Sequence, residues 1–499
     1  MKVLNSTQIK SADQYMILNE PISSIDLMER AAERCCEFLP STGQWDHLVV
    51  ICGIGNNGGD GLAIARMQTE NYQSVRVVVL QSSEIYSDDF ILNLNRWKEE
   101  NGKVQIVLNA SELYIHADEL VIDAILGTGV NRPVEGFLAE CIEAINQQAA
   151  FVIAIDLPSG MNSSAPTLGP MIKADLTVTI GAPKPALFFS ESAEFVGKWK
   201  LVSIYDDETV FAEYEEAPDT VDRSMAGAIL KVRMQFTHKG TYGKALIVAG
   251  CEGKYGAAVL AARACMRSGV GLLTVQVPSN ATQLIHQTTP EALLRADESP
   301  TRITHVEDFE KFDTLAIGPG IGTANETIDA FISLIKLYRK PMVIDADALN
   351  ILSEHPDLFS NLHENSILTP HPKEFERLFG KSENSFERLE KQKKQSALHK
   401  VIIVCKGHFT TITTPDGRVF FNMSGNSGLA KGGSGDVLTG ILTALLAQNY
   451  TPAEAAVLGV FIHGHSADLL ALNMHEAGIL PSDVIENLPY AFMDISLCE

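Results

Sequence analysis

Runs of apolar, β-branched residues alternate with helical patterns twice over along this 499-residue chain. Such alternation is typical of parallel sheets whose strands are joined by crossover helices. The first series of strands is predicted at residues 47–52, 75–80, 120–126, 151–156 and 176–181, and the second at 244–250, 271–277, 313–318, 341–346, 366–369 and 400–405. Because the two series differ in their loop motifs and spacing, we expect two unlike α/β domains and not a duplication.

An acidic stretch at residues 205–220, which contains a proline and little apolar periodicity, separates the two series. We place the boundary there, with one domain at 1–215 and a second at 222–499. Residues 410–422 alternate around a Pro-Asp-Gly turn and predict a β-hairpin that interrupts the parallel order. Residues 428–472 are helical by pattern, and Thr451 is placed to cap the second of two helices there.

The charge of the chain argues against a nucleic-acid partner. Its formal net charge is −23, and the one basic stretch, 391–394, suits the solvated face of a helix. The N-terminus is polar, and no apolar run reaches the roughly 18 residues that a membrane span needs. The eight cysteines have no CxxC or metal-ligand spacing and indicate reduced, mostly buried thiols: Cys35, Cys36, Cys52, Cys141, Cys251, Cys265, Cys405 and Cys498. We therefore expect a cytoplasmic protein with no membrane partner.

A glycine-rich motif, Gly-Ile-Gly-Asn-Asn-Gly-Gly-Asp-Gly at 53–61, follows the first predicted strand and precedes a helical run. Glycines at such a turn let a diphosphate approach the backbone, and the helix N-terminus favours its charge. The next strand ends without the acidic residue of an ordinary dinucleotide fingerprint, so a standard dehydrogenase is disfavoured. Asn56, Asn57 and Asp60 add oxygen ligands to the turn. The simpler alternative is a glycine-rich turn with Asp60 as a helix cap.

Two later strands of the first series also end in aspartate and glycine, in motifs that begin at Asp123 and Asp156. Since the carboxyl ends of parallel strands converge on one edge, we expect the three loops to face one pocket. Asn57, Asp123 and Ser159 offer hard oxygen ligands of low charge, which suit a monovalent cation or a water cluster better than zinc. Asp156, which precedes a rigid turn, is the candidate general base. Each aspartate taken alone would more often be a cap or a turn residue.

The strongest motif of the second domain runs from Asn426 to Gly440, as Asn-Ser-Gly-Leu-Ala-Lys-Gly-Gly-Ser-Gly-Asp-Val-Leu-Thr-Gly. Its successive backbone N–H groups predict an anion hole for phosphates where the loop enters a helix. Asp436 is placed to accept a proton from a substrate hydroxyl that faces this hole. No Walker loop exists in the chain, and a nucleophile elbow would need glycine at 436. The alternative is a glycine-rich turn with an aspartate cap.

Shorter motifs at strand edges or helix starts allow close approach of a ligand to the backbone; they lie at 239–243, 256–257, 318–322 and 369–374. His371 stands between two prolines and is held rigidly, so we expect it to contact a ligand, with a structural role as the alternative. His463 and His465 would point to different faces of a helix and lack a third ligand. This spacing favours core or interface positions over a metal site.

In their order along the chain, these motifs resemble those of two enzyme families. The first domain, with GNNGGDG, DAILGTG and DLPSG, resembles NAD(P)H-hydrate epimerases. The second, with HKGTYGK, GPGIG, TPHPKE and KGGSGD, resembles ADP-dependent NAD(P)H-hydrate dehydratases of the ribokinase-like fold. The similarity covers roughly residues 1–490 and includes Ser6, Gln8, Asp13 and the segment 27–31. It implies a Rossmann-like three-layer domain followed by a ribokinase-like α/β domain with a mostly parallel central sheet.

The resemblance implies repair of the hydrated cofactors NADHX and NADPHX. The first domain would interconvert the R and S epimers, and the second would dehydrate the S epimer to NAD(P)H with ADP as co-substrate, giving AMP and phosphate. In this kinase-like mechanism Asp436 deprotonates the C6 hydroxyl, which attacks the terminal phosphate of the nucleotide, and phosphate then leaves. A potassium ion in the epimerase site, a magnesium ion with the nucleotide and a homo-oligomer are further expectations.

The resemblance also assigns residues, with catalytic roles for Asp156 and Asp436. In the first domain the hydrate would be bound by Asn56, Asn57, Gly58, Gly59, Asp60, Gly127, Thr128, Gly129, Val130, Asn131, Arg132, Pro133 and Asp156, and potassium by Asn57, Asp123 and Ser159. In the second domain the hydrate would be bound by Ala257, Gly320, His371 and Asp436. ADP would be bound by Lys406, Gly407, His408, Phe409, Thr410, Asn426, Ser427, Gly428, Leu429, Ala430, Lys431, Gly432, Gly433, Ser434 and Gly435. Lys431 and Ser427 stand where the family pattern has threonine and proline, which bears on nucleotide preference or affinity.

Two other classes of protein stay open at this point. A ribokinase-like small-molecule kinase with a nucleotide-binding N-terminal domain would share the KGGSGD loop, but it would need neither the first domain's motifs nor TPHPKE. A non-catalytic nucleotide-binding or scaffolding protein would tolerate loss of Asp156 and Asp436, both of which are present.

Overall fold

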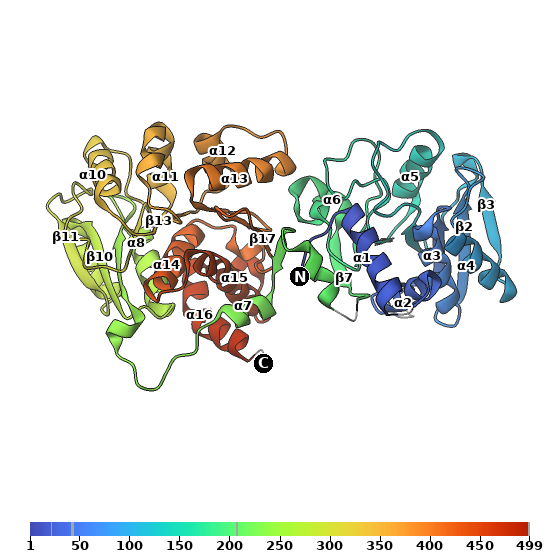
Figure 1. Cartoon of the computed structure of the whole chain (residues 1–499), viewed down its shortest axis with the longest axis horizontal. Helices are drawn as coiled ribbons and strands as arrows, with labels where there is room; N and C mark the ends of the chain where they lie inside the picture. Colours follow the sequence, from blue (N-terminus) through green and yellow to red (C-terminus); the bar gives the residue numbers. More distant parts are fainter. Residues whose placement is uncertain (21, 41–43, 206–207, 498–499) are drawn as a thin grey trace. The chain divides into compact units, whose positions relative to one another are not determined.

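The computed structural model describes residues 1–20, 22–40, 44–205 and 208–497 of the chain (Figure 1). Its contacts divide it into two compact units. The first unit comprises Lys2–Ala217 with Asn384–Phe386, and the second comprises Met1, Pro218–Glu383 and the residues from 387 onward. The division falls between Ala217 and Pro218, inside the acidic stretch 205–220, of which residues 206–207 lie outside the described ranges.

Within the described residues, the first unit has a seven-stranded, all-parallel sheet in the order β3-β2-β1-β4-β5-β6-β7. The strands are β1 His47–Cys52, β2 Ser74–Leu80, β3 Val104–Val107, β4 Glu119–Ala124, β5 Val152–Ile155, β6 Leu176–Ile180 and β7 Lys198–Val202. The chain builds outward from β1 to β3 and then restarts at β4 on the other side of β1. In open α/β sheets, such a reversal leaves a crevice at the carboxyl ends of the strands.

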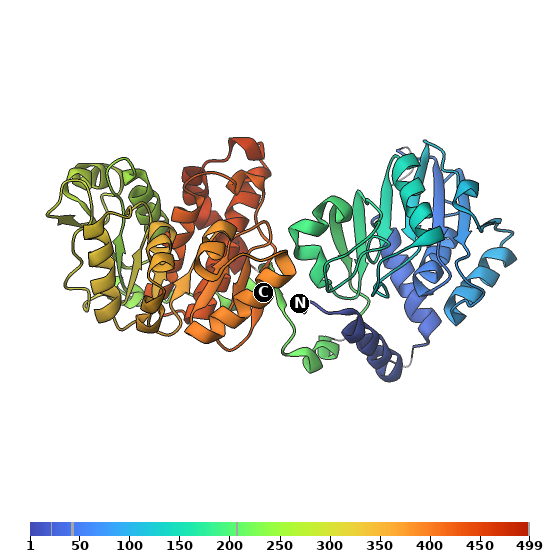
Figure 2. The ribbon, with the colours of Figure 1, turned by 90° about the horizontal axis from the view of Figure 1, so that it is seen from above.

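Helices cover both faces of this sheet and give the three layers expected of a Rossmann-like domain. They are α1 Ser6–Asn19, α2 Ser24–Cys36, α3 Asn56–Met67, α4 Asp88–Glu99, α5 Gly136–Gln148 and the short α6 Ala193–Val196. Apolar side chains of α1 to α4 form one buried core with the sheet, and those of α5 form a second core on the opposite face. Figure 2 shows the teal α5 and the dark blue N-terminal helices on opposite sides of the strands.

The sheet of the second unit has the order β11-β10-β9-β12-β13-β14-β15-β16-β17-β8. Neighbouring strands are parallel except where β16 pairs with β15 and with β17. The strands are β8 Asp219–Val221, β9 Lys244–Val248, β10 Leu272–Pro278, β11 Leu293–Asp297, β12 Thr314–Ile317, β13 Met342–Ile344, β14 Ile367–Leu368, β15 Ile402–Cys405, β16 Thr411–Thr413 and β17 Val419–Asn422. The mostly parallel sheet and the hairpin at 410–422 are therefore confirmed.

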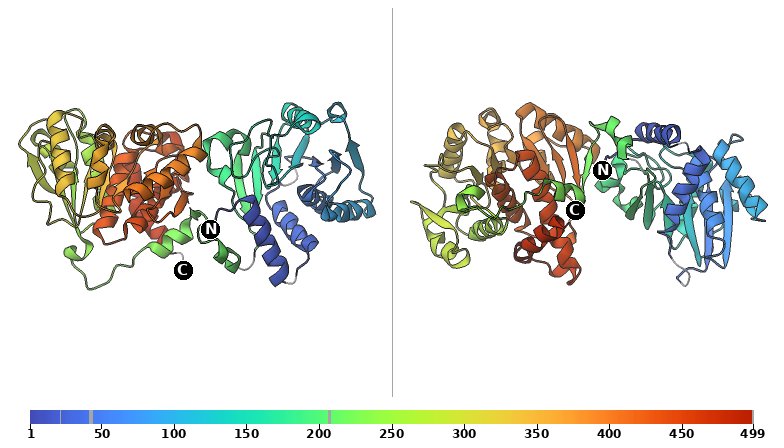
Figure 3. Two further views of the ribbon diagram at one scale, coloured as in Figure 1. Left: turned by 45° about the horizontal axis from the view of Figure 1, so that its top comes forward. Right: turned by 60° about the horizontal axis from the view of Figure 1, so that its bottom comes forward.

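Two hydrophobic cores lie on the two faces of the second sheet. Its helices are α7 Arg223–Ile229, α8 Tyr255–Arg267, α9 Thr282–Thr288, α10 Asn325–Leu337, α11 Ala346–Glu354, α12 Pro372–Phe379, α13 Ser385–His399, α14 Ser434–Ala447, α15 Pro452–Ala471 and α16 Pro481–Ser496. One core contains α8, α14, α15 and α16, and the other contains α10, α11 and part of α12. The red helices α14 to α16 gather together in both views of Figure 3.

The predicted interior strands are confirmed, and the strands that sequence analysis missed are the four edge strands. β3 and β7 close the first sheet, and β11 and β8 close the second. An edge strand packs less of its surface, so its sequence lacks a continuous apolar run. β3, for example, exposes Gln105 and Ile106, and β7 reads Lys-Trp-Lys-Leu-Val.

Two local predictions have clear outcomes. Thr451 caps α15, because its hydroxyl accepts the N–H of Glu454 at 3.3 Å while the Glu454 carboxylate accepts the N–H of Thr451 at 2.8 Å. The described cysteines are free thiols, buried at Cys35, Cys52, Cys141, Cys265 and Cys405 and half-buried at Cys36 and Cys251. Cys498 lies outside the described residues.

Candidate active sites

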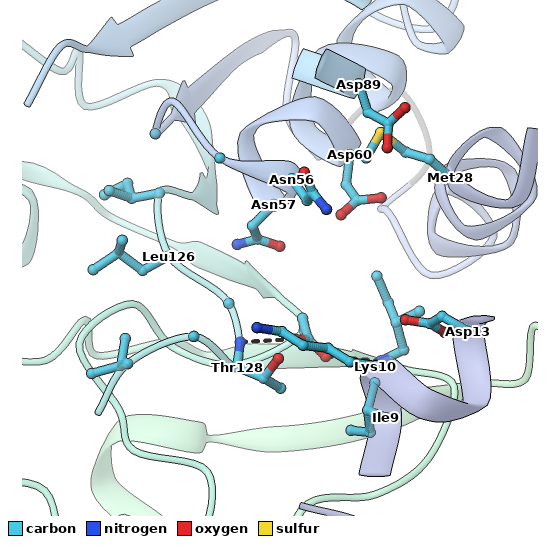
Figure 4. A pocket seen from close by; sticks show the side chains of 18 of the residues that line it. Ile9, Lys10, Asp13, Met28, Asn56, Asn57, Asp60, Asp89, Leu126 and Thr128 are labelled. Carbon is cyan, nitrogen blue, oxygen red and sulfur yellow. Dashed lines mark hydrogen bonds between the residues drawn. The ribbon is translucent and has the colours of Figure 1, made fainter. Parts of the chain in front are cut away.

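A cavity of about 1230 Å³ lies where the strand order of the first unit reverses, between β1 and β4. Its walls come from α1, from the turn between β1 and α3, from the loop after β4 and from the end of β5. Figure 4 shows Asn57 and Asp60 on one side of the cavity and Thr128, Lys10 and Asp13 on the other. The structure thus brings these predicted site residues around one pocket: Asn56, Asn57, Asp60, Gly127, Thr128, Gly129, Val130, Asn131, Arg132, Pro133 and Asp156.

The glycine-rich motif forms the first turns of α3 and is not a long loop. Only residues 53–55 make the turn, so Asp60 lies in the second turn of α3 and does not cap it. A Cβ atom on Gly53 would strike the carbonyl of Ile125, and one on Gly58 would strike the carbonyl of Gly53. These glycines let α3 begin tight against the end of β4. No side chain in the described ranges caps α3, so its first N–H groups can face an anionic ligand in the pocket.

A fully buried lysine holds the carboxylate of Asp156. The ammonium of Lys184 donates to Asp156 Oδ1, to the hydroxyl of Thr179 at 2.9 Å and to the carbonyl of Ile180 at 2.7 Å. These three acceptors satisfy all three ammonium protons. The other carboxylate oxygen of Asp156 accepts the N–H of Thr128 at 3.3 Å. Asp156 has a φ of 69°, a left-handed conformation that is rare outside glycine and that clusters at functional sites.

Two further carboxyl groups share the pocket. The hydroxyl of Tyr205 donates to Asp13 Oδ1 at 2.9 Å. Burial raises the pKa of Asp13 to about 6, although Tyr205 and Lys184 both lower it. Burial and the nearby carboxylates, Asp156 first among them, raise the pKa of Asp60 well above its usual value. The pocket therefore combines an ion-paired carboxylate with two carboxyls that hold their protons more tightly than usual.

Asp123 and Ser159 form a fully buried pair next to this pocket. The Ser159 hydroxyl donates to Asp123 Oδ1 at 2.5 Å, and its backbone N–H donates to Oδ2 at 2.8 Å. Burial raises the pKa of Asp123 to about 6 against these hydrogen bonds, which lower it. Asn57 lies against Gly127, and among the described residues its buried side-chain nitrogen has no partner. One carboxylate, one hydroxyl and one amide fit a hard cation of low charge.

In the second unit, a lysine joins two strand ends at the carboxyl edge of the sheet. Lys406, directly after β15, donates from its ammonium to Asp345 Oδ1 at 3.0 Å, and Asp345 directly follows β13. The hydroxyl of Thr439 on α14 donates to Asp345 Oδ2 at 2.8 Å. The ammonium also lies 3.9 Å from the carboxylate of Glu374. The buried charge of Asp345 is thereby paired.

Asp436 lies in the first turn of α14, whose N-terminus is open. Gly433 precedes the helix with a φ of 100°, and no side chain of the described residues caps it. The buried hydroxyl of Ser434 likewise lacks a hydrogen-bond partner in the described part of the chain. Burial, together with the carboxylate of Asp345, raises the pKa of Asp436 to about 7, although Lys406 lowers it. Unsatisfied N–H and O–H donors beside a carboxyl of this kind suit phosphate binding and proton abstraction at neutral pH.

The two predicted nucleotide segments meet at this helix. A Cβ atom on Gly435 would lie 3.3 Å from the ammonium of Lys406, so the segments 406–410 and 426–435 adjoin. Lys431 donates to the carbonyls of Ala477 at 2.7 Å and Ile479 at 2.6 Å, and the hydroxyl of Ser427 donates to Glu476. The two residues that depart from the family pattern thus tie the nucleotide loop to the segment before α16.

The loop after β12 brings Ala257 and Gly320 together. A Cβ atom on Gly320 would lie 3.2 Å from the Cβ of Ala257 at the start of α8. Asp347 holds this loop, since it accepts the N–H of Gly322 at 2.9 Å and the ammonium of Lys254 at 3.0 Å. Asp347 also helps to raise the pKa of Asp436, after burial and Asp345, so the loop lies near that carboxyl.

His371 and His465 have structural partners, whereas the buried Nε2 of His463 has none among the described residues. Nδ1 of His371 accepts the N–H groups of Lys373 at 3.1 Å and Glu374 at 3.2 Å and so caps α12. A contact of His371 with a ligand stays a prediction. His465 lies 2.8 Å from a carboxylate oxygen of Asp494, and burial lowers the pKa of His463 to about 4. In the described ranges, no three His, Cys, Asp or Glu side chains are grouped to hold a metal ion.

Sequence analysis missed Lys184, Tyr205 and Asp345 as site residues and gave Asp13 no role. Asp345 carries the same signal as Asp156, an aspartate at the end of a predicted strand, and could have been found by it. Lys184 and Tyr205 carry no such signal, because only the fold shows which carboxyl each one contacts.

Known proteins share both units. Residues 245–490 match the family described as NAD(P)H-hydrate dehydratase, and residues 24–186 match that described as YjeF-related protein N-terminus. The bifunctional NAD(P)H-hydrate repair enzyme Nnr of Moorella thermoacetica is 33% identical over 99% of this chain and 97% of its own. The Escherichia coli enzyme of the same name is 32% identical over 93% of this chain and 88% of its own. A solved ribokinase-like superfamily protein from Enterococcus faecalis is 26% identical, with a TM-score of 0.50 over 56% of this chain and 96% of its own.

These similarities confirm the resemblance found in the motifs and the ribokinase-like fold of the second unit. They extend over both units in one order and over nearly the full length of the relatives. The chain therefore belongs to the family of bifunctional NAD(P)H-hydrate repair enzymes, in which an epimerase domain precedes a dehydratase domain.

Proposed function

We propose that the first domain interconverts the R and S epimers of NADHX and NADPHX, with Asp156 as the general base. The pocket offers the open N-terminus of α3 for the diphosphate of the cofactor and the loop 127–133 for its other parts. The Lys184 ammonium pairs with the Asp156 carboxylate at the pocket wall, where this carboxylate can accept a proton from the substrate.

We further propose that the second domain dehydrates the S epimer with ADP as co-substrate. Asp436 accepts the proton of the C6 hydroxyl, and the hydroxyl oxygen attacks the terminal phosphorus of ADP, which releases AMP. Phosphate then leaves C6 with the electron pair of the C–O bond, and loss of a proton from C5 restores the double bond of NAD(P)H. The observation that carries this assignment is the position of Asp436 in the first turn of α14, beside an uncapped N-terminus, where burial and Asp345 raise its pKa to about 7.

Stoichiometry tests the dehydratase assignment. The protein is mixed with S-NADHX, ADP and Mg²⁺, and NADH absorbance, AMP and phosphate are measured together. One AMP and one phosphate should appear for each NADH formed. NADH recovery without ADP consumption would show that the hydroxyl does not leave as phosphate.

A potassium ion at Asn57, Asp123 and Ser159 is part of the proposal for the first domain. The Asp123 carboxylate, the Ser159 hydroxyl and the amide oxygen of Asn57 are hard ligands that suit such an ion, which would neutralise Asp123 and order the pocket wall. Thermal unfolding in KCl and in tetramethylammonium chloride at equal ionic strength tests it. The midpoint should be higher in KCl for the parent but equal in both salts for Ser159→Ala. Equal midpoints for the parent would contradict the site.

A magnesium ion would enter the second domain with the nucleotide. Asp345 and Asp347 are already paired with Lys406 and Lys254, so the phosphates and water would supply most of its ligands. Titration of ADP by calorimetry with and without Mg²⁺ checks this expectation.

The domain limits 1–215 and 222–499 are proposed as separate functional halves. β8, at Asp219–Val221, pairs with β17, so a second fragment should begin at Pro218 to keep its edge strand. The fragment 1–217 is expected to epimerise the hydrate, and the fragment 218–499 to dehydrate only the S form. Circular dichroism checks that each fragment folds.

The similarity of both units to bifunctional repair enzymes disfavours the alternative of a small-molecule kinase. No helix in the described ranges is both long and apolar enough for a bilayer crossing. A cytoplasmic location, a homo-oligomeric state and the absence of a nucleic-acid partner remain predictions, which cell fractionation, light scattering and an RNA-binding assay test.

A further inference from the structure

Asp13 is a carboxyl in the first pocket that the function stated above does not use. It projects from α1 into the cavity wall, opposite the turn between β1 and α3 (Figure 4). The buried Tyr205, from the segment after β7, donates its hydroxyl to Asp13 Oδ1 at 2.9 Å. A buried tyrosine that meets a pocket carboxyl is a device for stabilising that carboxyl in its ionised form.

We propose that Asp13 is the general acid of epimerisation and works in concert with Asp156 as the base. This inference rests on the proposed function of the first domain and adds the second reacting group of the same pocket. The two aspartates come from α1 and from the end of β5, and both line the one cavity.

The chemistry of the substrate calls for two such groups. The hydrate carries its hydroxyl on C6, next to the ring nitrogen N1, so C6 is the carbon of a cyclic hemiaminal. As Asp156 accepts the hydroxyl proton, the O–H electrons form the C6=O bond, and the C6–N1 electrons move to nitrogen. Asp13 donates a proton to N1, and an open-chain aldehyde results. Rotation about the C5–C6 bond and the reverse transfers close the ring with the opposite configuration, and no oxidant or reductant is needed.

The surroundings of Asp13 suit a group that gains and loses a proton in each cycle. Tyr205 and Tyr214 face it from the segment after β7, Lys184 and Asp156 face it from the strand ends, and Asp60 faces it from α3. Lys10 lies one turn earlier on its own helix. Burial raises the pKa of Asp13 to about 6, and the Tyr205 hydroxyl and the Lys184 ammonium stabilise the anion that remains after proton donation.

Asp60 is the competing candidate for this role. Burial and the neighbouring carboxylates raise its pKa well above the usual range, so it gives up a proton much less readily. A general acid works best when its pKa lies near the working pH. Asp60 is therefore suited to donating a hydrogen bond to the substrate while it stays protonated.

Asp13→Asn tests the assignment. Consumption of R-NADHX by the full chain is measured with excess ADP, where epimerisation must precede dehydration. We expect the rate to fall about 100-fold or more, which is the usual contribution of a general acid. Dehydration of S-NADHX by the same preparation should be unchanged, which shows that the second domain is folded, and a parent-like thermal unfolding curve shows that the first domain is folded. The matched control is Asp26→Asn, since Asp26 is an exposed carboxylate on α2 that accepts the hydroxyl of Ser23 at 2.5 Å and does not line the pocket. This control should stay within about twofold of the parent.

Tyr205→Phe separates catalysis from a structural role. An acid must carry its proton, so epimerisation should be lost as pH rises through the pKa of Asp13, which burial raises to about 6. Removing the Tyr205 hydroxyl destabilises the carboxylate and raises this pKa further, so the alkaline limb of the profile should move to higher pH. A purely structural tyrosine would lower the rate without moving the limb.

The outcomes distinguish a failure of the role assigned to Asp13 from a failure of the proposed function of the first domain. If Asp156→Ala removes epimerisation but Asp13→Asn does not, the proposed function stands and the role of Asp13 is refuted. The alkaline limb of the pH profile could instead stay in place in Tyr205→Phe and vanish in Asp60→Asn. This result would assign the general acid to Asp60 and would also overturn the proposal. If Asp156→Ala leaves epimerisation intact, the proposed base itself is wrong.

Discussion

The two candidate sites pair a lysine with an aspartate at a strand end, but they use the pair differently. In the first domain Lys184 contacts Asp156, which is the proposed base itself. In the second, Lys406 contacts Asp345, and in the described part of the chain the proposed base Asp436 forms no ion pair with a lysine. An aspartate at the end of a strand is therefore not always the base. In the first domain the lysine-paired aspartate is the proposed base, whereas in the second domain it lies beside the proposed base.

In each site, the carboxyl that we assign a proton transfer with a pKa close to neutral is one that forms no ion pair with a lysine within the described residues. Burial raises the pKa of Asp436 to about 7 and that of Asp13 to about 6. In the second domain this group takes a proton from a hydroxyl, whereas in the first it is proposed to give one. The comparison predicts that the activities of the two sites depend on pH in opposite directions.

The largest expected effect is that of Asp436→Asn. The amide cannot accept the C6 hydroxyl proton, so the dehydration rate should fall about 1000-fold, while the open N-terminus of α14 still binds phosphate. NADH absorbance measures dehydration, and calorimetry should give an ADP affinity within severalfold of the parent. Turnover near the parent rate would remove Asp436 from the mechanism.

Lys184→Met should lower the free energy of unfolding more than Lys406→Met does. Lys184 is fully buried, and its loss leaves Asp156 without its counter-charge, at a cost of about 3 kcal/mol or more. Lys406→Met should cost less, because the position of Lys406 is 23% exposed and the Thr439 hydroxyl still donates to Asp345. Urea unfolding measures the free energy of unfolding of both variants. An equal loss of stability in the two variants would contradict the distinction between the two ion pairs.

Dehydration activity should fall at acid pH, and the pKa of Asp436 should set the pH at which it falls. Asp436 must be ionised, and burial together with Asp345 raises its pKa to about 7, so activity should be full above this pH and fall below it. Lys406 lowers this pKa, so Lys406→Met should move the limb upward by about one pH unit at saturating ADP. A limb that does not move would show that Lys406 does not influence the base.

A small effect is expected at the two residues that depart from the family pattern. Lys431 holds the nucleotide loop through the carbonyls of Ala477 and Ile479. Lys431→Ala should raise the KM for ADP about fivefold and leave kcat nearly unchanged, because one exposed and one part-buried hydrogen bond are worth about 1 kcal/mol together. The surface variant Lys393→Ala is the control. A lower KM in Lys431→Ala would instead show that the lysine hinders the nucleotide.

Features of the fold that depend on local sequence patterns could be predicted from the sequence. The interior strands are continuous apolar runs, and the glycine-rich turns and the Thr451 cap follow from short spacings, so these elements could be located in advance. The edge strands β3, β7, β8 and β11 could not, because one side of each lacks a partner strand and its sequence is mixed. The start of α3 at Asn56 was also missed, since glycines normally weaken helices and here they serve close packing against β4.

Contacts between distant parts of the chain explain the rest of what was missed. Asp13 and Tyr205 are 192 positions apart, and Lys406 and Asp345 are 61 apart. No local pattern reports such a pair. The sequence could place aspartates at the active edges of both sheets, but only the fold shows which of them is paired with a lysine.

The central claim is that two sites with separate bases act in one chain. Consumption of a mixed pool of R- and S-NADHX with excess ADP tests it most directly in the Asp156→Ala variant. The parent should clear both epimers in one fast phase. The variant should clear the S form at the parent rate and the R form only at its spontaneous epimerisation rate, so the progress curve becomes biphasic. A variant that clears both epimers in a single fast phase would contradict the account, because epimerisation would then not depend on Asp156.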